Sequence, residues 1–324
     1  MSNFVVSSSP HISGKQSTAS VMRDVVISLL PALFAGVWVF GIRALVLTVI
    51  SVLSAVAFES LWNILFKKEN TISDFSACVT GMLLALILPV NTALWIPVVG
   101  NLFAIIIVKQ LFGGLGQNFI NPALCGRAFL LASWPLLTTV FVNTGVDLPL
   151  FSSVEMTDAI TSATPRSLMK VSGQGTAYLS LLLGNVSGCI GETSVIAILI
   201  GGIYLVARRV ITLHAPLSYI LSSALFGFVI GYNGIFTGDA LFTVLSGGIM
   251  FGGFFMITDY VTTPTTKKGQ VIAGIIAGFI TVLIRVKGGY PEGVTYAILF
   301  INVITPLIDK YVSPKKYGRV VNNG

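Results

Sequence analysis

The residues of this 324-residue chain that are best suited to chemistry lie in one hydroxyl-rich stretch. Asp158 is followed by Thr161, Ser162 and Thr164, and Pro165 comes directly afterwards. Hydroxyl groups that follow a carboxylate so closely could form a functional site. Serine and threonine side chains also bond to the backbone of turns, so ordinary loop residues produce the same pattern. Both interpretations are open on these residues alone.

The stretch lies within a polar interruption, residues 143–177, of a sequence that is otherwise mostly apolar. Hydrophobic residues make up 54% of the chain and charged residues only 10%, whereas soluble domains carry about 25% charged residues. This composition predicts a membrane-embedded protein. The net charge of +7 comes from short clusters between apolar blocks, as membrane topology requires, and does not indicate nucleic acid as a partner.

The metal-binding and thiol residues show no catalytic arrangement in the sequence. Cys78, Cys125 and Cys189 lack metal-ligand spacing and lie in or beside apolar runs, which predicts buried structural thiols. His11 and His214 also lie outside any metal-like cluster. A metalloenzyme or a hydrolase therefore has no support.

Ten apolar blocks reach, or nearly reach, the roughly 20 residues that a membrane-spanning helix needs. They cover residues 25–42, 44–66, 75–90, 92–112, 121–141, 193–210, 214–232, 239–257, 270–286 and 293–309. The sequence therefore predicts an all-α polytopic membrane protein with about ten transmembrane helices. Five blocks precede the polar interruption and five follow it, so any relation between the two groups would be an inverted repeat. Such a repeat is favoured by a weak similarity between Thr80-Gly81-Met82-Leu83 in the third block and Gly247-Gly248-Ile249-Met250 in the eighth.

Basic residues between the blocks predict the orientation. With the N-terminus in the cytoplasm, thirteen lysines and arginines fall on the cytoplasmic side and five outside, with Arg127 uncounted within a block, which fits the positive-inside bias. The predicted segments are a cytoplasmic N-terminus (1–22), a first five-helix half (23–142), an extracytoplasmic loop (143–192), a second half (193–310) and a cytoplasmic tail (311–324). Both termini are thus cytoplasmic, and Thr164 lies outside.

Several polar groups fall toward the cytoplasmic half of the membrane, where burying them is costly. They are Glu59, Asn121, Arg127, Asp259 and Thr262. One interpretation is a second redox or ligand pocket, with amides exposed at a helix that begins at Pro122. The alternative is a structural ion pair between Arg127 and either Asp259 or Glu59.

On the predicted outer side, a glycine-rich segment leads into the sixth block. Its last residues are Gly191, Glu192, Thr193 and Ser194, and we expect Thr193 or Ser194 to lie near the helix cap. Free amides and the helix dipole there would suit a phosphate or a flavin edge. Such segments are usually only turns, and this one gains interest because it faces the same compartment as Thr164.

The chain as a whole resembles a known family. Residues 158–165 are similar to the signal Asp-x-x-Thr-x-Ala-Thr, at which a flavin transferase esterifies FMN to the last threonine. Together with 121–135, 188–204 and 251–264, this motif resembles the D subunits of the Rnf electron-transport complex and, more distantly, the B subunits of the sodium-pumping NADH:quinone oxidoreductase. The resemblance covers residues 23–309. One departure is that Ala159 and Ser162 stand where the family often has glycine.

This resemblance implies a flavoprotein with ten helices, a fold similar to urea channels, and a place in a six-subunit complex. FMN would be esterified to Thr164, and a riboflavin would be bound without a covalent bond. The expected partners include a second flavin-bearing subunit and iron–sulfur membrane subunits. Electrons would enter at the outer FMN and move toward an inner-leaflet flavin, with ferredoxin:NAD chemistry coupled to sodium or proton movement. The expected flavin-binding residues are Asp158, Thr161, Ser162, Ala163, Thr164, Arg166, Gly191, Glu192, Thr193 and Ser194 outside, and Glu59, Asn121, Arg127, Asp259 and Thr262 inside.

The rival prediction is a channel or secondary transporter without a redox role, which inverted halves and proline-broken helices would equally suit; a purely structural scaffold is the third. A covalent flavin separates the predictions, because a channel has no use for a flavinylated threonine.

Overall fold

The computed structural model describes residues 17–68, 71–146, 148–151, 161–173, 175–232, 234–288 and 293–312, with only the backbone of 161–162. The first half contains α1 (Thr18–Phe40), α2 (Ile42–Leu65), η1 (Ile72–Asp74), α3 (Ser76–Leu86), α4 (Trp95–Asn101), η2 (Leu102–Gln110) and α5 (Pro122–Ser133). The connection contains α6 (Pro135–Thr139), β1 (Phe141–Val142), β2 (Thr161–Ser162), α7 (Pro165–Ser172) and α8 (Tyr178–Leu183). The second half contains α9 (Val195–Ala207), α10 (His214–Val229), β3 (Ile230–Gly231), β4 (Gly234–Ile235), α11 (Ala240–Leu245), α12 (Ile249–Phe251), η3 (Gly252–Met256), α13 (Lys267–Lys287) and α14 (Val294–Tyr311).

Each predicted apolar block contains helix, and four of the described helices, α1, α2, α13 and α14, are long and apolar enough to cross a membrane. Five further apolar helical segments are shorter, at 10–17 residues. Many large apolar side chains on the long helices are exposed, including Trp38 and Phe34 on α1 and Leu53 on α2. A helical bundle with apolar side chains facing outward is typical of a multi-pass membrane protein.

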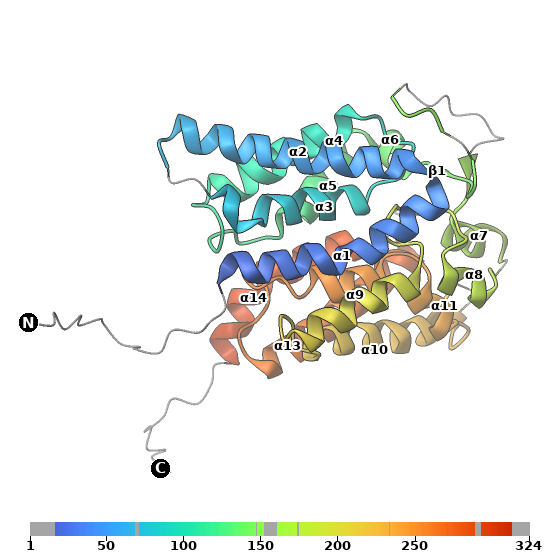
Figure 1. The fold of residues 1–324 in the computed structure, drawn as a ribbon. Helices are drawn as coiled ribbons and strands as arrows, with labels where there is room; N and C mark the ends of the chain where they lie inside the picture. Colours follow the sequence, from blue (N-terminus) through green and yellow to red (C-terminus); the bar gives the residue numbers. More distant parts are fainter. Residues whose placement is uncertain are drawn as a thin grey trace, which may run out of the picture.

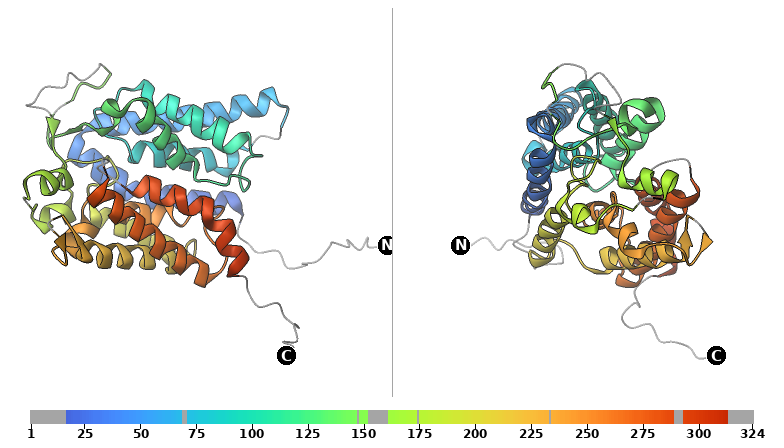
Figure 2. Two further views of the ribbon diagram at one scale, coloured as in Figure 1. Left: turned by 180° about the vertical axis from the view of Figure 1, so that it is seen from behind. Right: turned by 90° about the vertical axis from the view of Figure 1, so that its right-hand side faces the viewer.

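The two halves lie side by side along the length of the bundle (Figure 1; Figure 2, right). α1 begins and α14 ends at one end, here called the termini end, whereas α7 and α8 cover the opposite end, here called the α7 end (Figure 1). The two halves share an order of packing. In the first half, both α2 and α5 pack on the segment formed by α4 and η2. In the second half, both α10 and α14 pack on α13. α1 meets α9 across the halves, and α5 meets α14. A correspondence of this kind between the halves is what an inverted repeat predicts.

The α1–α9 contact shows the opposite directions of the halves. Near the start of α1, Asp24 accepts from the Tyr204 hydroxyl at 3.1 Å and pairs with Arg208 at 3.2 Å, close to the end of α9. Further along α1, a Cβ on Gly201 would lie 2.0 Å from the Ser28 carbonyl oxygen. The two helices are therefore antiparallel, and glycine lets their backbones approach closely.

Both halves contain a broken element. In the first half, α3 ends at Leu86, before Pro89, and the chain runs on without helix to α4, because proline cannot continue a helix. Residues 87–92 remain buried there. In the second half, α11 ends at Leu245 and α12 begins three residues after Ser246. The fifth predicted block is also shorter than expected, since α5 ends at Ser133, before Pro135.

Two buried arginines bind carbonyl groups near these breaks. Arg43 on α2 donates from Nε to the Val90 carbonyl at 3.0 Å, and Arg285 on α13 donates to the carbonyls of Thr243 and Ser246 at 3.1 and 3.3 Å. Each arginine is only 1% exposed. Free backbone carbonyls cannot face lipid, so these side chains make the breaks tolerable within a membrane.

The basic-residue count behind the predicted orientation must be refined accordingly. Arg43 and Arg285, counted as outer residues, and Lys109, counted as an inner residue, are all buried at 1–2% exposure and do not act as loop charges. Without them the count is twelve against three, so the asymmetry behind the predicted orientation persists.

Candidate functional site

Thr164 lies at the start of α7, where its hydroxyl caps the helix. The Thr164 side chain is 8% exposed and accepts a hydrogen bond from the Ser167 amide at 3.3 Å. The two hydroxyls are 2.9 Å apart, and Pro165 takes the first helical position. Helix starts favour both a hydroxyl cap and a negative group such as a phosphate. The geometry thus agrees with an ordinary cap and also with a site of phosphoester attachment.

The other residues of the hydroxyl-rich stretch are placed only in part. Asp158 lies outside the described residues. Thr161 and Ser162 form β2, whose backbone pairs with β1 in the register Val142 with Thr161. Ala163 is exposed. This short antiparallel pair fixes the backbone just before Thr164.

A pocket adjoins Thr164, here called the Thr164 cavity. It is lined by Phe141, Thr164, Pro165, Arg166, Leu181, Val186, Ser187, Gly188, Glu192, Thr193, Leu245 and Gly247. The sequence placed the glycine-rich segment and Thr164 in one compartment, and the structure brings them to one pocket. Ser194 caps α9 by accepting from the Ala197 amide at 3.4 Å, as expected for this helix start.

Two polar side chains of the Thr164 cavity suit an anionic group. Thr193 is 3% exposed, and its hydroxyl has no hydrogen-bond partner among the described residues. An unpaired buried hydroxyl is costly, so a ligand oxygen would satisfy it. Arg166 is 6% exposed and donates to the Tyr232 hydroxyl at 2.8 Å. Its positive charge at the cavity wall favours a phosphate nearby.

Glu192 connects the Thr164 cavity to the first half of the bundle. Its carboxylate pairs with Arg127 of α5 at 3.4 Å, and both side chains are at most 6% exposed. Arg127 also donates to the Cys189 sulfur at 3.5 Å. The expected alternatives for Arg127 were Asp259 and Glu59, whereas the ion pair that the structure shows uses Glu192.

The backbone around Glu192 is fixed by the broken element of the first half. The Gly191 amide donates to the Leu86 carbonyl at 2.7 Å, and the Ile190 amide donates to the Leu88 carbonyl at 3.1 Å. A Cβ on Gly191 would lie 2.7 Å from the Leu86 Cβ. Only glycine permits this approach, which accounts for the glycine at position 191.

Asn121, Asp259 and Thr262 come together around α14. The helix begins at Pro122, as predicted, and the Asn121 side chain caps it by accepting from the Leu124 amide at 3.2 Å. The backbone amide of Asn121 donates to the Asn302 side-chain oxygen at 3.0 Å. Thr262 donates to Asp259 at 3.2 Å, and its carbonyl accepts from Thr305 at 2.9 Å. Asn302 and Thr305 lie one turn apart on α14.

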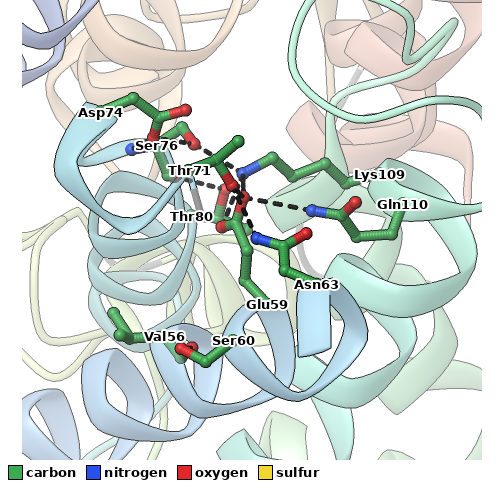
Figure 3. A network of polar contacts seen from close by, with 10 residues as sticks. All are labelled: Val56, Glu59, Ser60, Asn63, Thr71, Asp74, Ser76, Thr80, Lys109 and Gln110. Atoms are coloured by element: carbon green, nitrogen blue, oxygen red, sulfur yellow. Dashed lines mark hydrogen bonds and ion pairs between the residues drawn. The ribbon is translucent and has the colours of Figure 1, made fainter. Parts of the chain in front are cut away.

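Glu59 belongs to a separate buried network near the end of α2 (Figure 3). Lys109 pairs with Glu59 at 2.9 Å and donates to the Ser76 hydroxyl at 2.6 Å. Thr71 and Gln110 donate to the same carboxylate at 2.8 and 3.1 Å. The sequence alone assigned Lys109 no partner, although a lysine within the apolar block 92–112 indicates a buried counter-charge.

The described residues contain no group of three or more His, Cys, Asp or Glu side chains that could hold a metal ion. Cys189 is buried, and Cys78 and Cys125 are half-buried free thiols. The polar residues instead fall into three clusters: the Thr164 cavity with Arg127, the group around α14, and the Glu59–Lys109 network.

Apolar helices of spanning length, broken elements with satisfied carbonyls and a cavity beside a capping threonine define a multi-pass helical membrane protein. The model of the NQR2, RnfD, RnfE family matches residues 5–318. The chain is 49% identical over 322 residues to the D subunit of the Na(+)-translocating ferredoxin:NAD(+) oxidoreductase complex of Acetobacterium woodii, covering 98% of this chain and 96% of that protein. It therefore belongs to the NQR2, RnfD, RnfE family.

Two further relatives extend this similarity. The chain is 41% identical over 326 residues to the D subunit of the Proton-translocating ferredoxin:NAD(+) oxidoreductase complex of Clostridium ljungdahlii, covering 97% of this chain and 96% of the relative. It is 35% identical over 343 residues to the D subunit of the Ion-translocating oxidoreductase complex of Alcanivorax borkumensis, covering 99% and 98%. The names of these relatives differ in the ion that they state.

Proposed function

We propose that this chain is the flavin-carrying membrane subunit of an ion-translocating ferredoxin:NAD oxidoreductase complex, with FMN esterified to Thr164. Relatives at 35–49% identity over nearly the whole chain are named as D subunits of ion-translocating oxidoreductase complexes. The chain is not catalytic alone. Its partners would be the other members of the complex, including a second flavin-bearing subunit and iron–sulfur membrane subunits, and a flavin transferase would mature it.

The observation that carries the proposal is the Thr164 cavity. The Thr164 hydroxyl sits at a helix start, beside the Arg166 side chain and the unpartnered hydroxyl of Thr193. A phosphodiester on Thr164 would meet the helix amides and the Arg166 charge, and Thr193 could donate to one of its oxygens. The residues present therefore fit the phosphate end of FMN.

The chain's own residues would hold and orient the group. Gly191 and Ile190, which directly precede the lining residue Glu192, bond to the backbone of Leu86 and Leu88. Buried apolar residues such as Phe141 and Leu245 also line the cavity. A bound flavin would supply one- or two-electron transfer, here from a partner on the outer side toward a second flavin at the termini end.

For that second, non-covalent flavin, a riboflavin, the proposed location is the group around α14 at Asn121, Asp259 and Thr262. Glu59 and Arg127 are engaged by Lys109 and Glu192, so the proposed inner site is narrower than the sequence suggested. The proposed orientation places both termini in the cytoplasm and the α7 end outside a bacterial cell membrane.

The test of the covalent flavin is in-gel fluorescence of the denatured polypeptide, with the intact mass. The wild-type chain should fluoresce and exceed its sequence mass by one FMN less one water. Thr164→Ala should abolish both signals. Thr161→Ala is the matched control: it removes a hydroxyl from the same stretch and should keep the flavin, or lower its yield.

Two results would contradict the proposal. Fluorescence that survives in Thr164→Ala would mean that the flavin is attached elsewhere. A wild-type chain without covalent flavin, when isolated from cells that express the flavin transferase, would favour a transport subunit without a flavin of its own.

A further inference from the structure

The Arg127–Glu192 pair occupies an unusual position between the two halves of the bundle. Glu192 lines the Thr164 cavity, whereas Arg127 is not among the lining residues and reaches the carboxylate from α5. The charges are 3.4 Å apart and almost fully buried. The pair is therefore a fixed dipole whose negative end faces the cavity.

The position of the carboxylate is set by its surroundings. The amides of Ile190 and Gly191 hold its backbone to residues 86–88. On the other side, a Cβ on Gly248 would lie 2.5 Å from the Glu192 Oε1 atom. Gly248 belongs to the break between α11 and α12. Discontinuous backbone from both halves thus converges on this one buried charge.

We propose that the Arg127–Glu192 pair sets the reduction potential of the flavin attached to Thr164, with Glu192 acting as the negatively charged group in the wall of the Thr164 cavity. This inference rests on the proposed attachment of FMN to Thr164. Arg127 is a positioning residue: it pairs with the Glu192 carboxylate from α5 and holds it in place.

The physical reason is that each added electron makes the flavin more negative. A carboxylate at the cavity wall repels the added negative charge and so lowers the reduction potential. The guanidinium behind the carboxylate offsets part of this effect. Burial keeps these interactions strong, because little water screens them. At an effective dielectric constant of about 20 and a separation of about 10 Å, one unit charge changes the equilibrium constant for one-electron reduction on the order of tenfold, about 59 mV.

The signs follow from the arrangement. Glu192→Gln removes the negative charge at the cavity wall and leaves Arg127 positive. The reduction potential should therefore rise, by the equivalent of about a tenfold or larger change in the equilibrium constant for one-electron reduction. Arg127→Gln removes the positive charge and should lower the potential. Arg127→Lys keeps the charge and should leave the potential close to wild type. In the double variant Arg127→Gln with Glu192→Gln, the reduction potential should rise less than in Glu192→Gln alone.

The measurement is a spectroscopic redox titration of the intact complex in detergent. A complex with Thr164→Ala serves as the reference that lacks this flavin, so the difference spectrum isolates its contribution from the other redox groups. In-gel fluorescence first establishes that each variant retains its flavin. Potentials of Glu192→Gln and Arg127→Gln that equal the wild-type value would overturn the inference, as would shifts with the opposite signs.

A variant with one unpaired buried charge can fail to assemble. In that case the exchange of both residues, Arg127→Glu with Glu192→Arg, preserves the pair and reverses its direction. This complex should show a raised potential, and an unchanged or lowered one would refute the proposal. A purely structural pair predicts altered assembly without any shift. Absence of flavin from the wild-type chain would instead refute the proposed function, so the two failures are distinguishable.

Discussion

Replacing Lys109 with methionine should strongly destabilise the protein. Lys109 and Glu59 are 2% and 1% exposed and lie 2.9 Å apart. Methionine keeps much of the volume but removes the charge, two hydrogen bonds to Glu59 and the one to Ser76. The carboxylate would remain buried, with only neutral donors such as Thr71 and Gln110. Breaking a buried pair by removing one partner costs about 3–5 kcal/mol.

The companion change, Glu59→Gln, should cost about 3 kcal/mol for the same reason, because Lys109 would then be buried without its carboxylate. The double variant should cost clearly less than the sum of the two single variants. Neither charge is left alone in it, and the remaining groups can still bond to one another. We expect a coupling free energy of about 2 kcal/mol, within the range for residues in one polar network.

The assay is unfolding of the purified chain in mild-detergent micelles by titration with a denaturing detergent, followed by far-ultraviolet circular dichroism. Lys268→Met, which removes an exposed lysine at the start of α13, is the matched control and should change the free energy of unfolding by less than about 0.5 kcal/mol. The reasoning fails if Lys109→Met behaves like this control, or if the costs of the two single variants simply add.

Three further predictions concern packing, topology and the inner site. Gly201→Ala would place a Cβ 2.0 Å from the Ser28 carbonyl oxygen; it should lower the free energy of unfolding by about 1–3 kcal/mol, and an unchanged unfolding curve would mean that α1 and α9 pack less closely. A cysteine at Val171, which is 87% exposed at the α7 end, should react with an impermeant thiol reagent from outside whole cells. One at Lys268 should react only after lysis, and the reverse pattern would overturn the orientation. Asn121→Ala should release less riboflavin per polypeptide on denaturing extraction than wild type, while keeping the covalent flavin; equal release would move the inner site elsewhere.

The sequence predicted the local features of the fold well, because these features depend on neighbouring residues. Apolar blocks predicted where helix occurs, since a membrane accepts long apolar helices. Asn121 before Pro122 predicted the start of α5, and Ser194 was expected near the cap of α9. Helix ends were less predictable. The fifth block was extended to residue 141, whereas α5 ends at Ser133 because Pro135 follows.

The pairing of buried charges could not be read from the sequence. Arg127 and Glu192 are 65 residues apart, and Lys109 and Glu59 are 50 apart. Topology placed Arg127 only within a block, so any acidic group at similar depth was an equal candidate. The deciding fact is that the segment before α9 runs beside residues 86–88, which depends on the breaks in two distant elements. Long-range contacts of this kind follow from the assembled bundle.

The breaks themselves connect stability to function. In a continuous helix through residues 86–94, the Leu86 and Leu88 carbonyls would accept hydrogen bonds from amides of the same helix. Because the helix stops at Leu86, those carbonyls accept from Gly191 and Ile190 instead, and Glu192 follows directly. The interruption near Pro89 is therefore what brings a charge from the segment before α9 to Arg127 of the first half. A change that restored helix in this segment, such as Pro89→Ala, should loosen the Glu192 wall of the Thr164 cavity before it unfolds the bundle. Exchange of the Gly191 amide proton with solvent deuterium would measure this, and faster exchange with unchanged global stability is the expected result. If the Gly191 amide stays as protected as in the wild type, the break is not what fixes the wall.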